Sequence, residues 1–190
     1  MSKKPSFLIV ALALLVVAAV PAAPAGAVTF SDAAGVIENE AEIFIQGWDM
    51  EWETSGGPVE CEQLEIETTM EENAADPASL AEAPATIEGC TASWNPLIDI
   101  DAEEVEVGPI TVASDGTGEM PIEFAYTVQV PTPAHCKKMQ GAAELGFSSF
   151  PVEYAGWVYA SPFCPLGSHL RLSGHLQFYT ANGPVEVAFP

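Results

Sequence analysis

The sequence predicts an all-β fold, an antiparallel β-sandwich or barrel of roughly 9–12 strands stabilised by two disulfides. Apolar and polar residues alternate with a period of two through most of the chain, and Gly- and Pro-rich turns recur at short intervals. The sequence shows no long amphipathic helical pattern. A period of two is typical of a strand with one buried face, and strands without crossover helices between them pair antiparallel.

The first 27 residues are predicted to be a secretion signal, which leaves 28–190 as a single β-rich domain. Two lysines are followed by an unbroken apolar run from Phe7 to Val20, and Ala25-Gly26-Ala27 fits a cleavage site of small residues. The apolar run is too short to span a bilayer as a helix, although an uncleaved N-terminal anchor is the alternative. We therefore expect a secreted, extracellular protein, cleaved after Ala27, whose mature chain does not insert into a membrane.

The chain is strongly acidic, with 27 Asp and Glu against five Lys and Arg and a formal net charge of −22. Nucleic acids and anionic lipids bind to basic surfaces, so we expect neither as a partner. Most of the acids alternate with apolar residues, which indicates a solvated sheet face. Adaptation to high salt is the alternative explanation.

Between Ile37 and Glu53 the apolar parity changes after Gly47 and continues at Trp48, Met50 and Trp52. A glycine at such a change predicts a bulge or tight turn. Both tryptophans would then belong to the buried face as core residues; a ligand platform is the alternative.

A β-hairpin is predicted between Val59 and Ala92. Residues 61–70 alternate as one strand, and 85–90 form the return strand. If Cys61 lies opposite Cys90, Leu64 falls opposite Ile87, which makes an apolar cross-strand pair.

Strict alternation would nevertheless place the hairpin cysteines on the glutamate face. A bulge near Glu62-Gln63, matched by Gly89 across the ladder, would turn both cysteines inward. Pro77 and Pro84 are expected to limit regular structure between them to a helical turn.

Further strands are predicted at short intervals. Two short ones lie between Pro96 and Val112, with a break at Gly108-Pro109. The others cover 120–130, 152–160, 170–178 and 185–189. The segment from Pro131 to Gly146 is expected to be irregular, with a turn of helix.

Four cysteines in an exported chain imply two disulfides with three connectivities. The hairpin register favours Cys61–Cys90, and Cys136–Cys164 follows by elimination. A zinc site from His135, Cys136, Cys164 and His169 is the alternative, but this spacing matches no known zinc pattern.

The order of motifs is a signal peptide, Cys61, the Ile87-x-Gly89-Cys90 segment, Cys136, and Cys164-Pro165 followed by Leu170, Leu172 and Gly174. This order resembles a group of small, secreted, uncharacterised β-rich proteins from high-GC Gram-positive bacteria. The resemblance implies a secreted, disulfide-containing β-domain without an assigned activity. The acidic hairpin tip from Glu71 to Pro84 departs from that group.

Motifs of known enzymes are missing from the sequence: it has no G-x-S-x-G, H-E-x-x-H, P-loop or G-x-G-x-x-G after a strand. Ser168 and His169 are adjacent, and neighbours on a strand point to opposite faces, so no nucleophile–base pair is predicted.

We expect no cofactor, with calcium as the alternative. Asp99, Asp101 and Glu103 are the candidate ligands, at the start of a stretch that resembles an EF-hand loop. Glu104 occupies the position where that loop requires glycine, and outward acids on a strand explain the same pattern.

The leading functional hypothesis is a non-catalytic secreted or cell-surface β-domain that binds an extracellular ligand or has a structural role. The alternatives are a small secreted hydrolase using carboxylates and a calcium-stabilised or salt-adapted module. An exposed aromatic patch favours the first, a cleft with two carboxylates about 5–10 Å apart the second, and converging acid oxygens near Asp99 the third.

Overall fold

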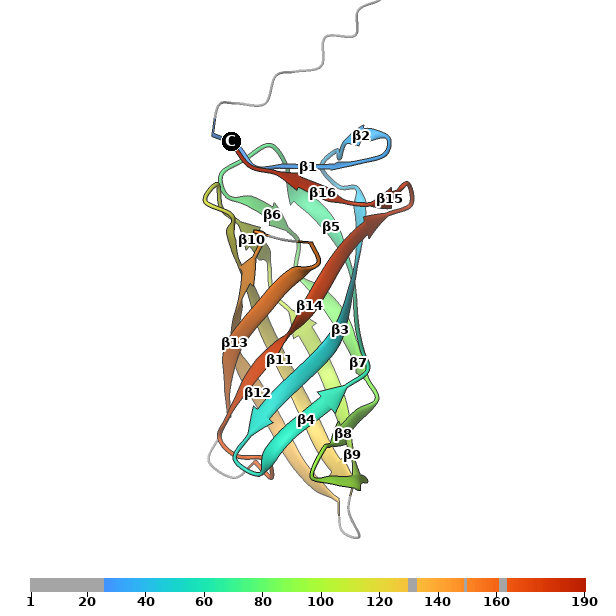
Figure 1. Ribbon diagram of the computed structural model, residues 1–190, viewed down its shortest axis with the longest axis vertical. Helices are drawn as coiled ribbons and strands as arrows, with labels where there is room; N and C mark the ends of the chain where they lie inside the picture. Colours follow the sequence, from blue (N-terminus) through green and yellow to red (C-terminus); the bar gives the residue numbers. More distant parts are fainter. Residues whose placement is uncertain (1–25, 130–132, 149, 161–163) are drawn as a thin grey trace, which may run out of the picture.

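The strands close on themselves as an antiparallel barrel (Figure 1). The computed structural model describes residues 26–129, 133–148, 150–160 and 164–190. The strands are β1 (Thr29–Asp32), β2 (Gly35–Val36), β3 (Glu42–Thr54), β4 (Gly57–Cys61), β5 (Gln63–Glu72), β6 (Ala78–Leu80), β7 (Ala83–Glu88), β8 (Cys90–Ala92), β9 (Asn95–Val107), β10 (Ile110–Val112), β11 (Thr117–Gln129), β12 (Ala134–Gly146), β13 (Val152–Ala160), β14 (His169–Thr180), β15 (Gly183–Pro184) and β16 (Glu186–Ala188).

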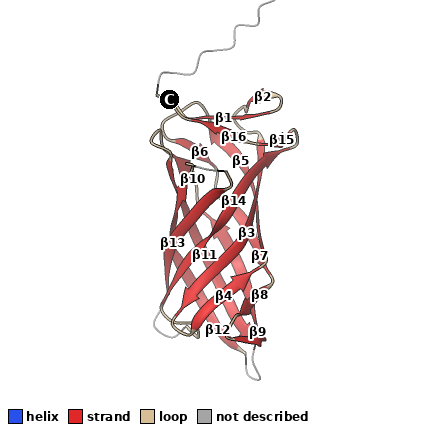
Figure 2. Ribbon diagram, in the orientation of Figure 1, coloured by secondary structure: helices blue, strands red, loops and turns tan. Residues whose placement is uncertain are grey.

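The barrel has eight strand positions, each paired with the positions on either side of it. From β3 the ring passes through β14, β13, β12, β11 and β9, then through β7 and β8 to β5 and β4, which pair with β3 again. The sequence left sandwich and barrel open, and the pairing of β14 with β3 closes the barrel. The prediction of an all-β fold is confirmed, since the described residues contain strands and no helix (Figure 2). None of the described segments is a helix able to cross a membrane.

Apolar side chains fill the barrel, because alternate residues of every strand point inward. Trp52, Phe124 and Tyr126 form a buried cluster inside it, with ring centroids 5.0 to 6.4 Å apart. Leu64 and Ile66 are buried, whereas Glu65 and Glu67 face the solvent. The glutamates between the apolar residues are therefore the solvated outer face, as the sequence indicated.

Three long strands each contain one extra residue that shifts their register. The bulges lie at Trp48-Asp49 in β3, Glu103-Glu104 in β9 and Lys137-Lys138 in β12. At each bulge two consecutive residues point away from the core, so the alternation changes parity there. The backbone has positive φ at Asp49 (52°) and Glu104 (49°).

These bulges account for two wrong predictions. The parity change in β3 lies two residues after Gly47, so Trp52 is buried as predicted but Trp48 lies half-buried on the outer wall. Of the segment predicted as irregular, Ala134 to Gly146 is β12, a strand of 13 residues, and Pro131 and Thr132 lie outside the described residues. The alternation of β12 was hidden because Lys137 and Lys138 both point outward.

Other expectations were wrong in detail. The region between Pro77 and Pro84 contains a short strand, β6, paired with β5 and β10. We had expected no regular structure there beyond a helical turn. Pro96 to Val107 belongs to a single long strand, although the predicted break at Gly108-Pro109 is present. The predicted signal peptide lies outside the described residues up to residue 25.

The hairpin register is confirmed. Cys61 and Cys90 form a disulfide, and Leu64 pairs with Ile87. The strands break opposite each other at Glu62 and Gly89, and the register is the same on both sides of the break. Both cysteines point into the core, with 4% and 3% of their surface exposed. The irregularity thus turns the disulfide inward, as expected, without inserting a net residue.

A small sheet of β16, β1 and β2 lies across one end of the barrel (Figure 1). Phe30 of β1 is buried against Phe178 of β14, with ring centroids 6.4 Å apart. The Asn73 side chain accepts a hydrogen bond from the Phe30 amide and donates to the carbonyls of Phe30 and Ile37. The side chain of Asn73 thereby anchors this small sheet to the end of β5.

Candidate functional site

The outer wall carries a groove of about 1200 Å³ that runs across β3, β14, β13, β12, β11 and β10. One row of the ladder pairs Glu51 with Ser173, Ser173 with Ala155, Ala155 with Glu144 and Glu144 with Glu119. Two small residues therefore lie between carboxylates on either side, and the wall is hollow where the side chains are small.

Five carboxylates line this acidic groove: Asp49, Glu51, Glu119, Glu144 and Glu153. All five are exposed, and Glu119 lies directly opposite Glu144, where like charges repel. Acid catalysis of glycoside cleavage uses a carboxyl whose pKa is raised by an apolar environment. The groove contains the carboxylates that a hydrolase uses, but none of the five is buried in the apolar environment that a catalytic acid requires.

His175 lies at one side of the acidic groove, between Trp48 of β3 and Glu153 of β13 in the ladder. Its ring stacks on Trp48, with centroids 6.1 Å apart and planes at 20°. Its Nδ1 lies 3.7 Å from Asp49 Oδ2 and has no hydrogen-bond partner among the described residues. Trp48 thus has a surface role in place of the core role expected from the sequence.

Two large aromatic side chains are exposed on the same wall. Trp157 is 46% and Tyr159 is 57% exposed, at alternate outward positions of β13. Across the ladder Trp157 pairs with Arg171 and Tyr159 with His169. The His169 ring lies 6.0 Å from Trp157 between centroids. We refer to Trp157, Tyr159, His169 and Arg171 as the aromatic face.

The positive charges of the described residues lie on the two strands that pair with β13. The lysines and the arginine of that part of the chain are Lys137, Lys138 and Arg171, on β12 and β14. Lys138 forms an ion pair with Glu123, and Arg171 Nη1 lies 3.7 Å from Glu53 Oε2. Charges of both signs therefore lie beside the aromatic face, because the small groove that Tyr159 lines also contains Glu82, Glu106 and Glu123.

The calcium candidates do not converge. Asp99, Asp101 and Glu103 occupy alternate outward positions of β9, roughly 6.8 Å apart along the strand. Gln129 donates a hydrogen bond to Asp101, and Thr127 donates one to Glu103, both at 2.7 Å. No three His, Cys, Asp or Glu of the described residues are grouped so that they could hold a metal ion.

The expectation that Ser168 and His169 point to opposite faces of a strand was wrong. Ser168 Oγ lies 3.3 Å from His169 Nδ1. Strand alternation does not apply to this pair, because Ser168 precedes the first residue of β14. Both residues are exposed, and they form a local contact beside the aromatic face.

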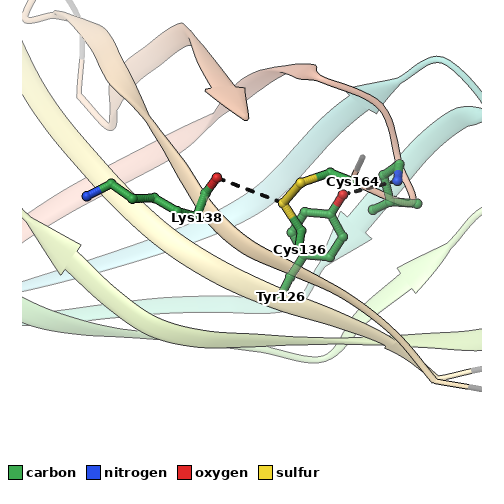
Figure 3. The surroundings of a disulfide bond; sticks show 5 residues. Tyr126, Cys136, Lys138 and Cys164 are labelled. Carbon is green, nitrogen blue, oxygen red and sulfur yellow. Dashed lines mark hydrogen bonds between the residues drawn. A yellow bond between two sulfur atoms is a disulfide. The ribbon is translucent and has the colours of Figure 1, made fainter. Parts of the chain in front are cut away.

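The second predicted disulfide, Cys136–Cys164, is also confirmed. It joins β12 to the turn before β14, and because both sulfurs are oxidised they cannot serve as zinc thiolates. Figure 3 shows the Tyr126 ring beside this disulfide. The Leu166 amide donates a hydrogen bond of 3.0 Å to the Tyr126 hydroxyl, and burial raises the pKa of Tyr126 to about 12. The turn is thus fixed to the barrel by one covalent bond and one buried hydrogen bond.

Comparison of the chain with protein-family models, with curated proteins and with solved structures finds no match. Its function therefore has to be argued from its own surface.

The aromatic face was missed at the level of sequence, although a signal for it exists. In the segment from Val152 to Ala160, Trp157 and Tyr159 share the parity of Glu153. A glutamate at that parity marks the outward face, so both rings had to point to the solvent.

Proposed function

We propose that the protein is a secreted, non-catalytic binding module that contacts an extracellular ligand with its aromatic face. The observation that carries this proposal is the exposure of Trp157 and Tyr159 on a strand that is hydrogen-bonded on both sides. Large apolar side chains gathered on a surface are typical of interaction sites, and a strand paired on both sides carries them on a backbone that needs no ordering at binding.

Export is supported by the two disulfides, which form in oxidising compartments, and by the sequence features of residues 1–27. The absence of catalysis is supported by the exposed carboxylates of the acidic groove, which lack the environment of a general acid.

The test uses the protein purified from culture medium and an array of extracellular polysaccharides and peptides. We expect a ligand whose binding is lost in Trp157→Ala/Tyr159→Ala and retained in Trp94→Ala. Trp94 is a matched control because it is 42% exposed but lies in the turn between β8 and β9. Binding that is unchanged in the double variant would refute the aromatic face as the site.

A carboxylate hydrolase remains the second candidate, because the acidic groove brings Glu144 and Glu153 to neighbouring strands. Product analysis of the same polysaccharides decides this point. Release of shorter sugars by the natural protein, lost in Glu144→Gln or Glu153→Gln, would replace the binding proposal by an enzymatic one.

A further inference from the structure

We infer that the ligand of the aromatic face is a neutral polysaccharide whose sugar rings stack on Trp157 and Tyr159. This inference rests on the proposed function and adds the chemical class of the ligand. Its basis is the geometry of the aromatic face, the charge around it and the size of its apolar part.

The geometry offers two stacking positions in line. Trp157 and Tyr159 are two residues apart on one face of β13, so their Cα atoms are separated by roughly 6.8 Å along the strand. β12 and β14 pair with this part of β13 on both sides, which fixes the backbone that carries the two rings. A chain of linked rings can contact both aromatic side chains at once.

Polar groups surround the two rings. Tyr159 lies between Gln140 and His169 in the ladder, and Trp157 pairs with Arg171 on one side. On its other side Trp157 pairs with Ala142, whose small side chain leaves that edge of the indole uncovered. A sugar ring has an apolar face of C–H groups and a rim of hydroxyls. An aromatic surface edged by amide, imidazole and guanidinium groups matches both parts.

Charge argues for a neutral ligand. The formal net charge of −22 repels an anionic polymer from the barrel as a whole. A cationic polymer is attracted to the carboxylates of the whole wall, with no preference for the aromatic face. Beside Trp157 lies Arg171, and of the glutamates in the groove that Tyr159 lines, Glu123 is paired with Lys138. A neutral ligand is neither repelled by the barrel nor attracted to its other walls, so stacking on the two rings decides where it binds.

Size argues against a folded protein as the ligand. Stable protein–protein interfaces bury about 800 Å² on each partner. The aromatic face has two large exposed apolar side chains, flanked by Ala142, Ala155 and charged residues. Two rings edged by polar groups suit stacking on a narrow polymer better than packing against a broad apolar surface.

Affinity electrophoresis of the secreted protein tests the inference, with gels that contain a neutral β-glucan or xylan, polygalacturonate, or chitosan. We expect retardation by a neutral polymer, weakened about tenfold in Trp157→Ala and abolished in the double variant with Tyr159→Ala. Tyr159→Phe, which keeps the ring, and Trp94→Ala should be retarded like the natural protein. Unchanged melting temperatures establish that the variants are folded.

Each other outcome is informative. Retardation by polygalacturonate or chitosan alone, with the same dependence on Trp157, would overturn the neutral class and leave the binding module standing. Binding of a peptide through Trp157, without any polysaccharide, would have the same meaning. No binding that depends on Trp157 or Tyr159 to any of these ligands would overturn the inference and the proposed function together.

Discussion

Leu64 and Ile66 point into the barrel, whereas Glu65 and Glu67 on the same strand point out, and this alternation separates two faces with different demands. The inner face is apolar and tightly packed all the way around the barrel, so each residue there is constrained by its neighbours. The outer face contains features that do not stabilise the fold. Glu119 opposes Glu144, and Trp157 and Tyr159 remain exposed. This difference indicates that the residues of the inner face determine stability, and that a binding site is to be sought on the outer face.

The largest effect that tests this comparison is the loss of the inward disulfide. Replacing Cys61 and Cys90 together with Ala should lower the free energy of unfolding by about 2–5 kcal/mol and leave the other bridge intact. The measurement is urea-induced unfolding, with peptide mapping of the remaining disulfide.

The chain contains a matched control for this experiment. Cys136 and Cys164 are separated by 28 residues and Cys61 and Cys90 by 29, so the loop-entropy terms are nearly equal. Cys61 and Cys90 are both buried in the core, whereas Cys164 is half-buried. We therefore expect the hairpin pair to cost more. An equal or smaller loss would show that burial on the inner face adds nothing to this disulfide.

The second prediction concerns a close approach of β13 to β12. A Cβ atom added at Gly156 of β13 would overlap the carbonyl oxygen of Ala142 on β12. Gly156→Ala should therefore destabilise the barrel by about 3 kcal/mol in thermal unfolding, because the clash is with backbone.

Gly146→Ala is the control on the neighbouring strand, since the nearest atom to its added Cβ is the Glu153 oxygen at 3.8 Å. We expect this variant to unfold at nearly the natural temperature. Equal losses of stability in Gly156→Ala and Gly146→Ala would mean that the strand propensity of the residues, rather than the clash, determines the stability of both variants.

The inner face was largely predictable from the sequence. A period of two gave the strand class, and the register that aligns Cys61 with Cys90 also aligns Leu64 with Ile87. The predictions failed where a bulge puts two consecutive residues on one face, as at Lys137-Lys138. Alternation read from the sequence alone does not show whether a polar pair ends a strand or bulges from it.

The outer face was less predictable, because a site there depends on which strands become neighbours. Glu144 and Glu119 meet only through the pairing of β12 with β11, and β12 was not expected to be a strand. The closure of β14 on β3, which brings His175 beside Trp48, is a long-range pairing that local patterns do not encode.

The third prediction tests a polar group on the inner face. Tyr126→Phe removes the acceptor of the Leu166 amide and leaves that N–H without its partner, which should cost about 1–2 kcal/mol at neutral pH. Tyr159→Phe is the control, because its hydroxyl is on an exposed side chain and its loss should change stability little.

The same residue predicts a loss of stability at alkaline pH. Burial raises the pKa of Tyr126 from 10.0 to about 12. The contribution of its protonated form is thus complete below pH 10 and is lost as the pH rises toward 12. Unfolding midpoints measured from pH 8 to about 12 should fall less steeply in Tyr126→Phe than in the natural protein. Burial also raises the pKa of Tyr154, so part of the alkaline loss should persist. Identical slopes would contradict the assignment to Tyr126.

The smallest effect, and the one of opposite sign, is expected on the outer face. Glu144→Gln removes one of two carboxylates that face each other across β12 and β11, so we expect a gain of about 0.5 kcal/mol at low ionic strength. Salt screens exposed charges over about 10 Å at 0.1 M, so the gain should fade as sodium chloride is added. Glu67→Gln is the control, since Glu67 faces Phe44 on the neighbouring strand and relieves no directly opposed charge. The natural protein itself should become more stable with salt, because its net charge of −22 is screened. If Glu144→Gln destabilises the protein while Glu67→Gln does not, the Glu144 carboxylate has a favourable partner in solution, and the acidic groove rather than the aromatic face becomes the first place to look for a ligand.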